Sequence, residues 1–320
     1  MKTHNFPSCS AFAPANRFSK TIWAMTALLF FLIAPGKVLA ESVPAYQRII
    51  TSTPSATEIL FAIGAGDRVV AVTDFCSYPP EACKLPSIGG LLNPSVESWI
   101  TLRPDLIIYQ GGNNRLASNA RNLNIETLSV PLDNLKDIYS AIKKLGDLTG
   151  QQKEAEQLSA KIQSQLNEFK NALKNVHSKS VLLLLGDSND PRRDLYAVGK
   201  GTFLDELLTL AGGENILPPT AARYPKVTKE FIIKVSPEII IEAGPKSRLS
   251  PEEQQERIVA WSRFPGIRAV QTKSIFFIGD DYVLLPGPRL TQTVERFGQV
   301  IHPGLFSQKN SSSVNTQTRK

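Results

Sequence analysis

The chain has 320 residues, of which 42% are hydrophobic and 20% are charged, a composition typical of a folded globular protein that excludes a disordered, collagenous or polytopic membrane protein. A length above roughly 250 to 300 residues favours two domains or lobes. The formal net charge is +7, but residues 1–40 hold four positive charges and residues 307–320 hold three, with no acid in either segment, so residues 41–306 are neutral and predict no nucleic-acid-binding surface.

Residues 1–40 have the three-part layout of a secretory signal. Basic residues up to Lys20 precede an apolar run at 22–33, and Val38 and Ala40 form a small-residue cleavage pattern. The apolar run is shorter than the roughly 20 residues that span a bilayer, which favours cleavage near Ala40 over a retained membrane anchor. The sequence therefore predicts an exported, soluble, periplasmic protein.

Strand-like and helix-like runs alternate in the chain that follows. In order they are a strand at 48–52, a helix at 55–63, a strand at 68–72, a helix at 96–102, a strand at 105–109, a strand at 181–185 and a helix at 202–210. This alternation predicts an α/β fold with parallel sheets flanked by helices. Ser55 and Glu58 have the spacing of a capping box, which predicts how the first helix begins.

Two cysteines, Cys76 and Cys83, remain after cleavage of the signal. In an oxidising compartment they can pair across the short loop between them. Two inert thiols are the alternative. A metal pair is a weaker one, because a structural zinc site normally needs four ligands.

Residues 151–177 are predicted to form one helix between two lobes. The segment lacks proline and glycine, and its apolar residues recur in steps of three and four, the pattern of an amphipathic helix. A single helical crossover is stiff, so we expect the lobes to move little when a ligand binds.

An internal repeat indicates that the two lobes are similar. In each copy a glutamate, Glu97 or Glu230, stands seven residues before a proline that is followed by an acid and a run of Leu and Ile, and the two prolines are 133 residues apart. Coincidence in a common helix-to-strand pattern is the alternative. We predict two Rossmann-like lobes at 41–150 and 178–304 and a disordered tail at 305–320.

The chain resembles the periplasmic substrate-binding proteins of ABC importers for cobalamin and ferric siderophores. The resemblance rests on residues 48–60, 72–82, 212–216 and 286–289 together with the two glutamate-proline repeats. It implies two lobes joined by one rigid helix, a ligand cleft between them and no catalysis. The Tyr-Pro-Pro segment at 78–80 and Tyr224 before Pro225 are most similar to the cobalamin-binding branch. The implied function is delivery of a corrinoid to the permease and ATPase of an inner-membrane ABC importer.

The resemblance also implies which residues carry this function. The cleft-lining positions are matched by Phe75, Leu91 and Tyr109 in the first lobe and by Leu185, Tyr224 and Asp281 in the second. Aromatic rings suit such a cleft, because they cover a semi-apolar ligand at little entropic cost. Glu97 and Glu230 match the glutamates that project from the two lobes and pair with arginines of the permease.

Two departures from the cobalamin-binding pattern leave the ligand open. Where those proteins place an arginine shortly after the aspartate matched by Asp281, this chain has Leu285. Where they have tryptophans in the cleft, it has Leu91, Tyr109 and Tyr224. A related corrinoid, a ferric siderophore or haem are therefore the alternative ligands.

Other classes of protein find little support in the sequence. The mature chain keeps two histidines, His177 and His302, both expected at the surface, whereas direct capture of a metal ion draws on several histidine and carboxylate ligands. No Gly-x-Ser-x-Gly or His-Glu-x-x-His motif is present, which argues against a secreted enzyme. A receptor without a transporter is the remaining alternative, and a permease and an ATPase encoded beside this chain would distinguish the two. We expect a monomer without a cofactor.

Overall fold

The computed structural model describes residues 46–90, 94–112, 114–186, 195–219 and 222–306, which belong to one compact unit. In this part of the chain no helix combines the length and the apolar character that a membrane crossing needs. The predicted signal lies outside the described residues. One residue of the predicted tail packs on the core, because Phe306 is buried and stacks on Phe169 with 5.9 Å between ring centroids.

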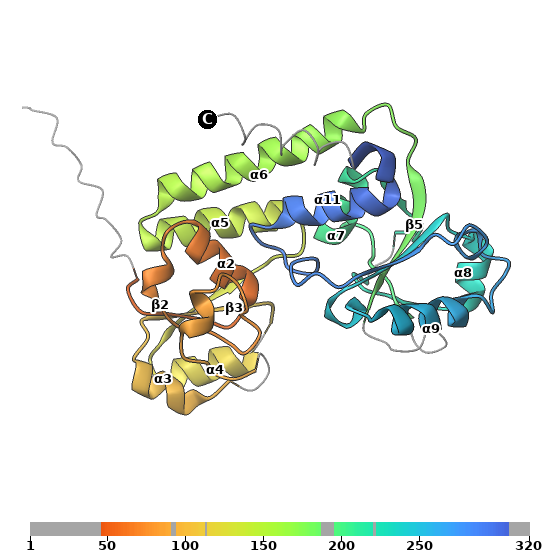
Figure 1. The fold of residues 1–320 in the computed structure, drawn as a ribbon. Coiled ribbons are helices and arrows are strands. Elements are labelled where there is room, and N and C mark those ends of the chain that lie inside the picture. The colour runs from red at the N-terminus through yellow and green to blue at the C-terminus, as the bar shows by residue number, and fades with distance from the viewer. Residues whose placement is uncertain (1–45, 91–93, 113, 187–194, 220–221, 307–320) are drawn as a thin grey trace, which may run out of the picture. The chain divides into compact units, whose positions relative to one another are not determined.

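The first lobe is a parallel four-stranded sheet flanked by helices (Figure 1). Its elements are β1 (Ile49–Thr51), α2 (Pro54–Ala62), the 3-10 turn η1 (Gly66–Arg68), β2 (Val69–Ala71), η2 (Ala82–Lys84), α3 (Val96–Leu102), β3 (Leu106–Gln110), α4 (Asn114–Asn122), β4 (Glu126–Val130) and α5 (Leu135–Thr149). The strand order is β2-β1-β3-β4. The predicted alternation of strands and helices is confirmed here.

The second lobe repeats this topology. Its elements are β5 (Lys179–Leu185), β6 (Leu195–Tyr196), α7 (Phe203–Leu210), β7 (Gly213–Asn215), β8 (Lys226–Val227), α8 (Lys229–Val235), β9 (Ile239–Ala243), η3 (Pro245–Ser247), α9 (Pro251–Trp261), α10 (Arg268–Gln271), β10 (Ile275–Ile278) and α11 (Leu290–Ile301). Its parallel sheet has the order β10-β9-β5-β7, and β6 and β8 form a separate antiparallel pair. Read from β7, this order is that of the first lobe, so the structure confirms two similar lobes.

Helices α3 and α8 occupy equivalent places in the repeat, directly before β3 and β9. Each ends at a non-glycine residue in the left-handed region, Arg103 with φ 47° and Ser236 with φ 43°. Each of these residues precedes a proline, which disfavours the α region for the residue before it. The repeated sequence thus stops both helices in the same way.

The acid after each proline supports the central strand of its own lobe. The carboxylate of Asp105 accepts hydrogen bonds from the backbone N–H groups of Gln47 and Arg48, at 2.7 and 3.0 Å, just before β1. The carboxylate of Glu238 accepts one from the N–H of Ser180 in β5 at 2.8 Å. The two acids of the repeat therefore have the same structural role.

Helix α6 (Gln152–Ala172) connects the lobes and packs on α5 of the first lobe and on α7 and α11 of the second (Figure 1). Gly146 of α5 permits the close approach, since a Cβ there would lie 2.5 Å from the Cβ of Ala155. The helix is shorter than the predicted 151–177. Leu173 and Val176 lie in tight turns after α6 and still pack on the core. Their apolar spacing therefore continued the helical pattern beyond the end of the helix.

Each sheet is covered on both faces, and the inner cores of the two lobes merge. One cluster runs from Ile49 through Phe169 to Val181 and Phe297, and so links both sheets through α5, α6, α7 and α11. Separate outer clusters surround Trp99 in the first lobe and Trp261 in the second. The shared inner core holds the lobes together behind the cleft described below.

The predicted capping box is wrong. Helix α2 begins at Pro54, and its N-cap residue Thr53 makes no side-chain capping bond. Glu58 is buried and its carboxylate binds Arg289, which lies 231 residues further along the chain. A local spacing rule could not anticipate so distant a partner.

Candidate ligand-binding cleft

A cavity of about 1100 Å³ lies between the lobes. Its wall comes from segments that follow strands of both sheets, together with the start of α7 and the loop before β8. The lining residues are Ser52, Thr53, Pro54, Ser55, Asp74, Phe75, Ser77, Gln110, Gly112, Arg115, Leu132, Asp133, Phe203, Tyr224, Pro245, Arg248, Gly279, Asp281, Leu284, Leu285 and Pro286. The carboxyl ends of parallel strands are where α/β sheets bind ligands, so this cavity is the candidate site.

The structure brings three of the six predicted cleft residues to this wall. Phe75 and Tyr224 line it with 58% and 38% of their surfaces exposed, and Asp281 lines it as well. Leu91 lies outside the described residues.

Tyr109 and Leu185 do not line the cavity. Tyr109 packs on the outer cluster around Trp99, whereas the next residue, Gln110, points into the cavity because side chains alternate along a strand. Leu185 packs on the inner core.

The cavity wall also carries charged residues that no sequence pattern indicated. Arg115 comes from α4 of the first lobe and Arg248 follows η3 in the second. Arg248 is exposed and its backbone packs on Gly279, where a Cβ would lie 2.3 Å from the Arg248 nitrogen. A search for polar residues within two positions after each predicted strand would have found Asp74 and Gln110.

The acids of the wall have partners. Asp133 forms an ion pair with Arg223, and the Asp74 carboxylate accepts a hydrogen bond from the hydroxyl of Ser87. Asp281 accepts two hydrogen bonds from Arg289, each 3.1 Å long.

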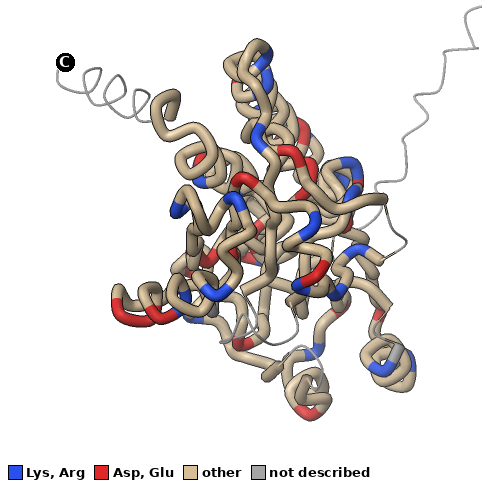
Figure 2. The backbone as a smooth tube through the Cα atoms, turned by 90° about the vertical axis from the view of Figure 1, so that its right-hand side faces the viewer, with Lys and Arg blue, Asp and Glu red and all other residues tan. Residues whose placement is uncertain are grey.

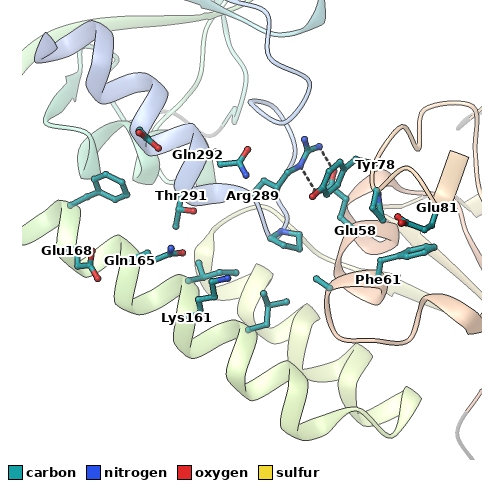
Figure 3. A pocket seen from close by; sticks show the side chains of 17 residues that line it. Glu58, Phe61, Tyr78, Glu81, Lys161, Gln165, Glu168, Arg289, Thr291 and Gln292 are labelled. Carbon is teal, nitrogen blue, oxygen red and sulfur yellow. Dashed lines mark hydrogen bonds and ion pairs between the residues drawn. The ribbon is translucent and has the colours of Figure 1, made fainter. Parts of the chain in front are cut away.

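Arg289 joins the two lobes beside the cleft. Its Nε and Nη2 donate to the carboxylate of Glu58 at 2.9 and 2.6 Å, while its Nη1 donates to Asp281. The guanidinium lies 4.2 Å from the centre of the Tyr78 ring and 5.4 Å from that of Tyr282. Figure 3 shows Arg289 and Glu58 facing each other with Tyr78 alongside. The motif at 286–289 and the segment at 48–60 therefore meet in this ion pair.

The pKa values of the pair follow from burial and contact. Burial raises the pKa of Glu58, while the bonds from Arg289 act to lower it. Burial acts to lower the pKa of Arg289, but its bonds to Glu58 and Asp281 outweigh burial and raise it. Each charge is thus tolerated in the interior only because the other is present.

A second cavity, of about 1170 Å³, lies between α2, α6 and α11. Lys161, Gln165 and Glu168 enter it from α6 and Thr291 and Gln292 from α11 (Figure 3). Glu58 and Arg289 also line this cavity, whereas their partner Asp281 lines the cleft. The ion-pair network therefore lies between the two cavities.

A second polar contact joins the lobes at the start of α5. The carboxylate of Glu206 in α7 accepts a hydrogen bond from the N–H of Leu135 at 2.6 Å, and the N–H of Phe203 donates to the carbonyl of Asp133 at 2.7 Å. Burial raises the pKa of Glu206, against the effect of the Leu135 bond.

Replacing Glu206 by glutamine is expected to flatten the dependence of the unfolding free energy on pH. The folded-state pKa of Glu206 lies above the ordinary 4.5, so its contribution to stability is present at low pH and is lost as the pH rises through that pKa. Glutamine keeps an acceptor for the N–H of Leu135 but cannot ionise. Urea unfolding at a series of pH values should show wild type losing stability relative to Glu206→Gln as the pH rises above about 4.5.

Glu252 provides a control of opposite sign. It is exposed, and hydrogen bonds to its own backbone and to Ser250 lower its pKa, so wild type should lose stability relative to Glu252→Gln as the pH falls. If the unfolding free energies of wild type and Glu206→Gln depend on pH in the same way, the pKa of Glu206 is not raised in the folded state.

The two cysteines are thiols in the structure. Cys76 is buried, with its Sγ 3.3 Å from the hydroxyl of Thr57, and the thiol of Cys83 donates to the carbonyl of Ser77 at 3.2 Å. The disulfide that the spacing allowed is not formed in this structure.

The expectation of two surface histidines is half wrong. His177 is exposed, but His302 is buried, its Nε2 lies 3.2 Å from the carbonyl oxygen of Gly212 and burial lowers its pKa. Across the residues that the structure describes, no group of three or more His, Cys, Asp or Glu side chains is placed to hold a metal ion.

The two repeat glutamates lie on the surface, one in each lobe. Glu97 is exposed in the first turn of α3, and Glu230 is exposed in the first turn of α8. Hydrogen bonds to its own backbone and to the hydroxyl of Thr228 lower the pKa of Glu230. Both positions agree with the repeat as read from the sequence.

Comparison with known proteins places this geometry among binding proteins. A family model described as "Periplasmic binding protein" matches residues 49–282. An ABC transporter substrate-binding lipoprotein of Bacillus subtilis is 30% identical over 270 residues, which cover 82% of each chain.

Two solved structures share the fold. A periplasmic vitamin B12 binding protein of Vibrio cholerae matches with a TM-score of 0.67 and 25% identity, covering 80% of this chain and 96% of that one. A possible iron-binding protein of Staphylococcus epidermidis matches with a TM-score of 0.70 and 26% identity, covering 80% and 99%.

Proposed function

We propose that this chain, which belongs to the periplasmic binding protein family, captures a corrinoid in the cleft and delivers it to the permease and ATPase of an ABC importer. It is an ABC substrate-binding protein that acts outside the cytoplasm, and it is not an enzyme. Export as a soluble periplasmic protein after cleavage near Ala40, and a monomeric state, are part of the proposal.

The cleft is the observation that carries this proposal. Its volume of about 1100 Å³ lies at or above the upper end of the roughly 300 to 1,000 Å³ that ordinary small-molecule pockets occupy. Exposed aromatic rings enter it from both lobes, Phe75 from the first and Tyr224 from the second. A large, flat ligand with a semi-apolar face suits these rings, because they are rigid and lose little entropy when covered.

Similarity to the vitamin B12 binding protein supports a corrinoid as the ligand. The environment of Tyr224 is compatible with packing on such a ligand. Burial, followed in effect by the charge of Asp133, raises the pKa of its hydroxyl, so the side chain is a neutral phenol at neutral pH and presents its ring.

Haem is the second candidate, and the cleft contains specific groups that favour it. A tyrosine oxygen can bind haem iron, and the guanidinium groups of Arg115 and Arg248 suit the two carboxylates of a haem. The raised pKa of Tyr224 works against this candidate, because the iron-binding form of a tyrosine is its anion.

Replacing Tyr224 by alanine is expected to weaken corrinoid binding by about 1 to 3 kcal/mol, the cost of removing a buried aromatic anchor. Tyr224→Phe should bind cyanocobalamin nearly as wild type does, because the ring is kept. Calorimetric titration of both variants with cyanocobalamin measures these differences.

The phenylalanine variant separates the two candidates. If haem is the ligand and Tyr224 binds its iron, Tyr224→Phe will lose haem affinity and change the haem absorption spectrum as severely as Tyr224→Ala. Tyr196 is a matched control, since it is also 38% exposed and does not line the cavity. Equal cyanocobalamin affinity for wild type and Tyr224→Ala, with folding unchanged, would remove Tyr224 from the site.

The two repeat glutamates are proposed to bind the permease. Glu97 and Glu230 are exposed at equivalent positions of the two lobes, and we assign them to ion pairs with arginines of the permease. Such pairs fix the orientation of a complex and raise its association rate.

A further inference from the structure

Two exposed isoleucines repeat the spacing of the glutamates. Ile100 of α3 has 60% of its surface exposed and Ile233 of α8 has 43%. They stand 133 residues apart, as Glu97 and Glu230 do. Each isoleucine therefore lies three residues after the glutamate of its own helix.

The structure places each isoleucine on the same helix face as its glutamate. Residues three apart are neighbours on a helix surface. The opposite faces are fixed by the fully buried side chains of Trp99 in α3 and Ile232 in α8, which are again 133 residues apart. Because one side chain of each helix is buried, the glutamate and the isoleucine of that helix are exposed to solvent together in each lobe.

An exposed apolar side chain needs no explanation when it stands alone. Ile100 and Ile233 differ because they occupy equivalent positions of the repeat. Each also lies beside a glutamate that we propose binds the permease. Elsewhere in the described chain, exposed apolar residues such as Val259 and Leu305 have no such counterpart. The repetition distinguishes both isoleucines from isolated exposed apolar residues.

We propose that Ile100 and Ile233 are apolar anchors of the permease interface, each entering an apolar socket beside the cation that pairs with its glutamate. This inference rests on the proposed function, because it extends the docking surface assigned to Glu97 and Glu230. A receptor that carries the same patch twice, Glu97 with Ile100 and Glu230 with Ile233, fits a partner that offers two equivalent sites.

The two kinds of contact should leave different kinetic signatures. Exposed charges act mainly on the association rate and on its dependence on salt, because salt screens them. A buried apolar anchor acts mainly on the dissociation rate and is insensitive to salt.

The test measures binding of the ligand-free receptor to the permease-ATPase complex of its ABC importer, held in lipid nanodiscs, from about 50 to about 500 mM salt. Ile100→Ser and Ile233→Ser should each raise Kd about tenfold through faster dissociation, with the salt dependence of wild type. Glu97→Gln and Glu230→Gln should slow association and flatten the salt dependence. Leu305→Ser is the matched control, since Leu305 is 50% exposed beyond α11 and outside both patches.

The outcomes separate the inference from the proposed function. If the glutamate variants lose affinity while both isoleucine variants bind as wild type does, Ile100 and Ile233 are not anchors. The assignment of Glu97 and Glu230 to the permease interface is then kept. If wild type does not bind the permease, both fail. Sedimentation velocity tests whether a second copy of the chain binds this surface instead. If wild type is a dimer and Ile100→Ser and Ile233→Ser make it a monomer, the surface is a contact between copies of the chain and the inference is wrong. Unchanged melting temperatures show that the variants fold.

Discussion

Replacing Arg289 by methionine is expected to lower the free energy of unfolding by about 3 to 5 kcal/mol, the cost of breaking one side of a buried ion pair. The side chains of Arg289 and Glu58 are only 9% and 2% exposed. Methionine fills much of the space of the arginine stem but leaves the Glu58 carboxylate uncompensated in the interior. The loss should exceed that of any surface pair, because surface pairs contribute about 1 kcal/mol or less.

Urea unfolding measures this loss, and two variants control it. Lys143→Met breaks an exposed pair with Asp147 on α5 and should cost less than about 1 kcal/mol. The double variant Glu58→Gln with Arg289→Met removes the stranded charge and should recover much of the stability. If Arg289→Met unfolds at the wild-type urea concentration, the pair does not stabilise the junction of the lobes.

Replacing both Glu97 and Glu230 by glutamine is expected to abolish receptor-stimulated ATP hydrolysis while leaving ligand affinity unchanged. The two charge pairs orient the complex and speed its formation, and both are lost from the same complex. Both residues are exposed and neither lines the cleft, so the receptor should still fold and bind its ligand. The measurement is ATP hydrolysis by the reconstituted importer with ligand-loaded receptor.

Glu252→Gln is the control for this experiment, since Glu252 is an exposed first-turn glutamate of α9 outside both patches. It should stimulate ATP hydrolysis as wild type does. Stimulation by the double variant at the wild-type rate would mean that the two glutamates are ordinary solvated acids of short helices.

Patterns of short range were predicted well from the sequence. The run at 181–185 lies within β5 (Lys179–Leu185), and the helix at 96–102 has the observed bounds of α3, because strand and helix periodicities are local properties. The repeat predicted equivalent lobes, since each copy contains its own helix stop and strand support.

Features set by distant contacts could not be predicted in this way. Glu58 has a local pattern that suits a capping box, yet its partner Arg289 lies in the other lobe. Tyr109 and Gln110 are adjacent, and only the packing of the sheet decides which of them faces the cleft. Arg248 reaches the cavity through a turn after β9 that carries no periodic signal.

Calorimetric titration of residues 41–320, the form that we propose is exported, with cyanocobalamin tests the central claim most directly. Calorimetry is preferred to tryptophan fluorescence because Trp99 and Trp261 are fully buried and neither lines the cleft. Parallel titrations use cobinamide, haem and a panel of ferric siderophores. The proposed function predicts saturable binding of one cyanocobalamin per chain, more weakly by Tyr224→Ala. Binding of haem or a ferric siderophore at one per chain, with no heat from either corrinoid, would contradict it.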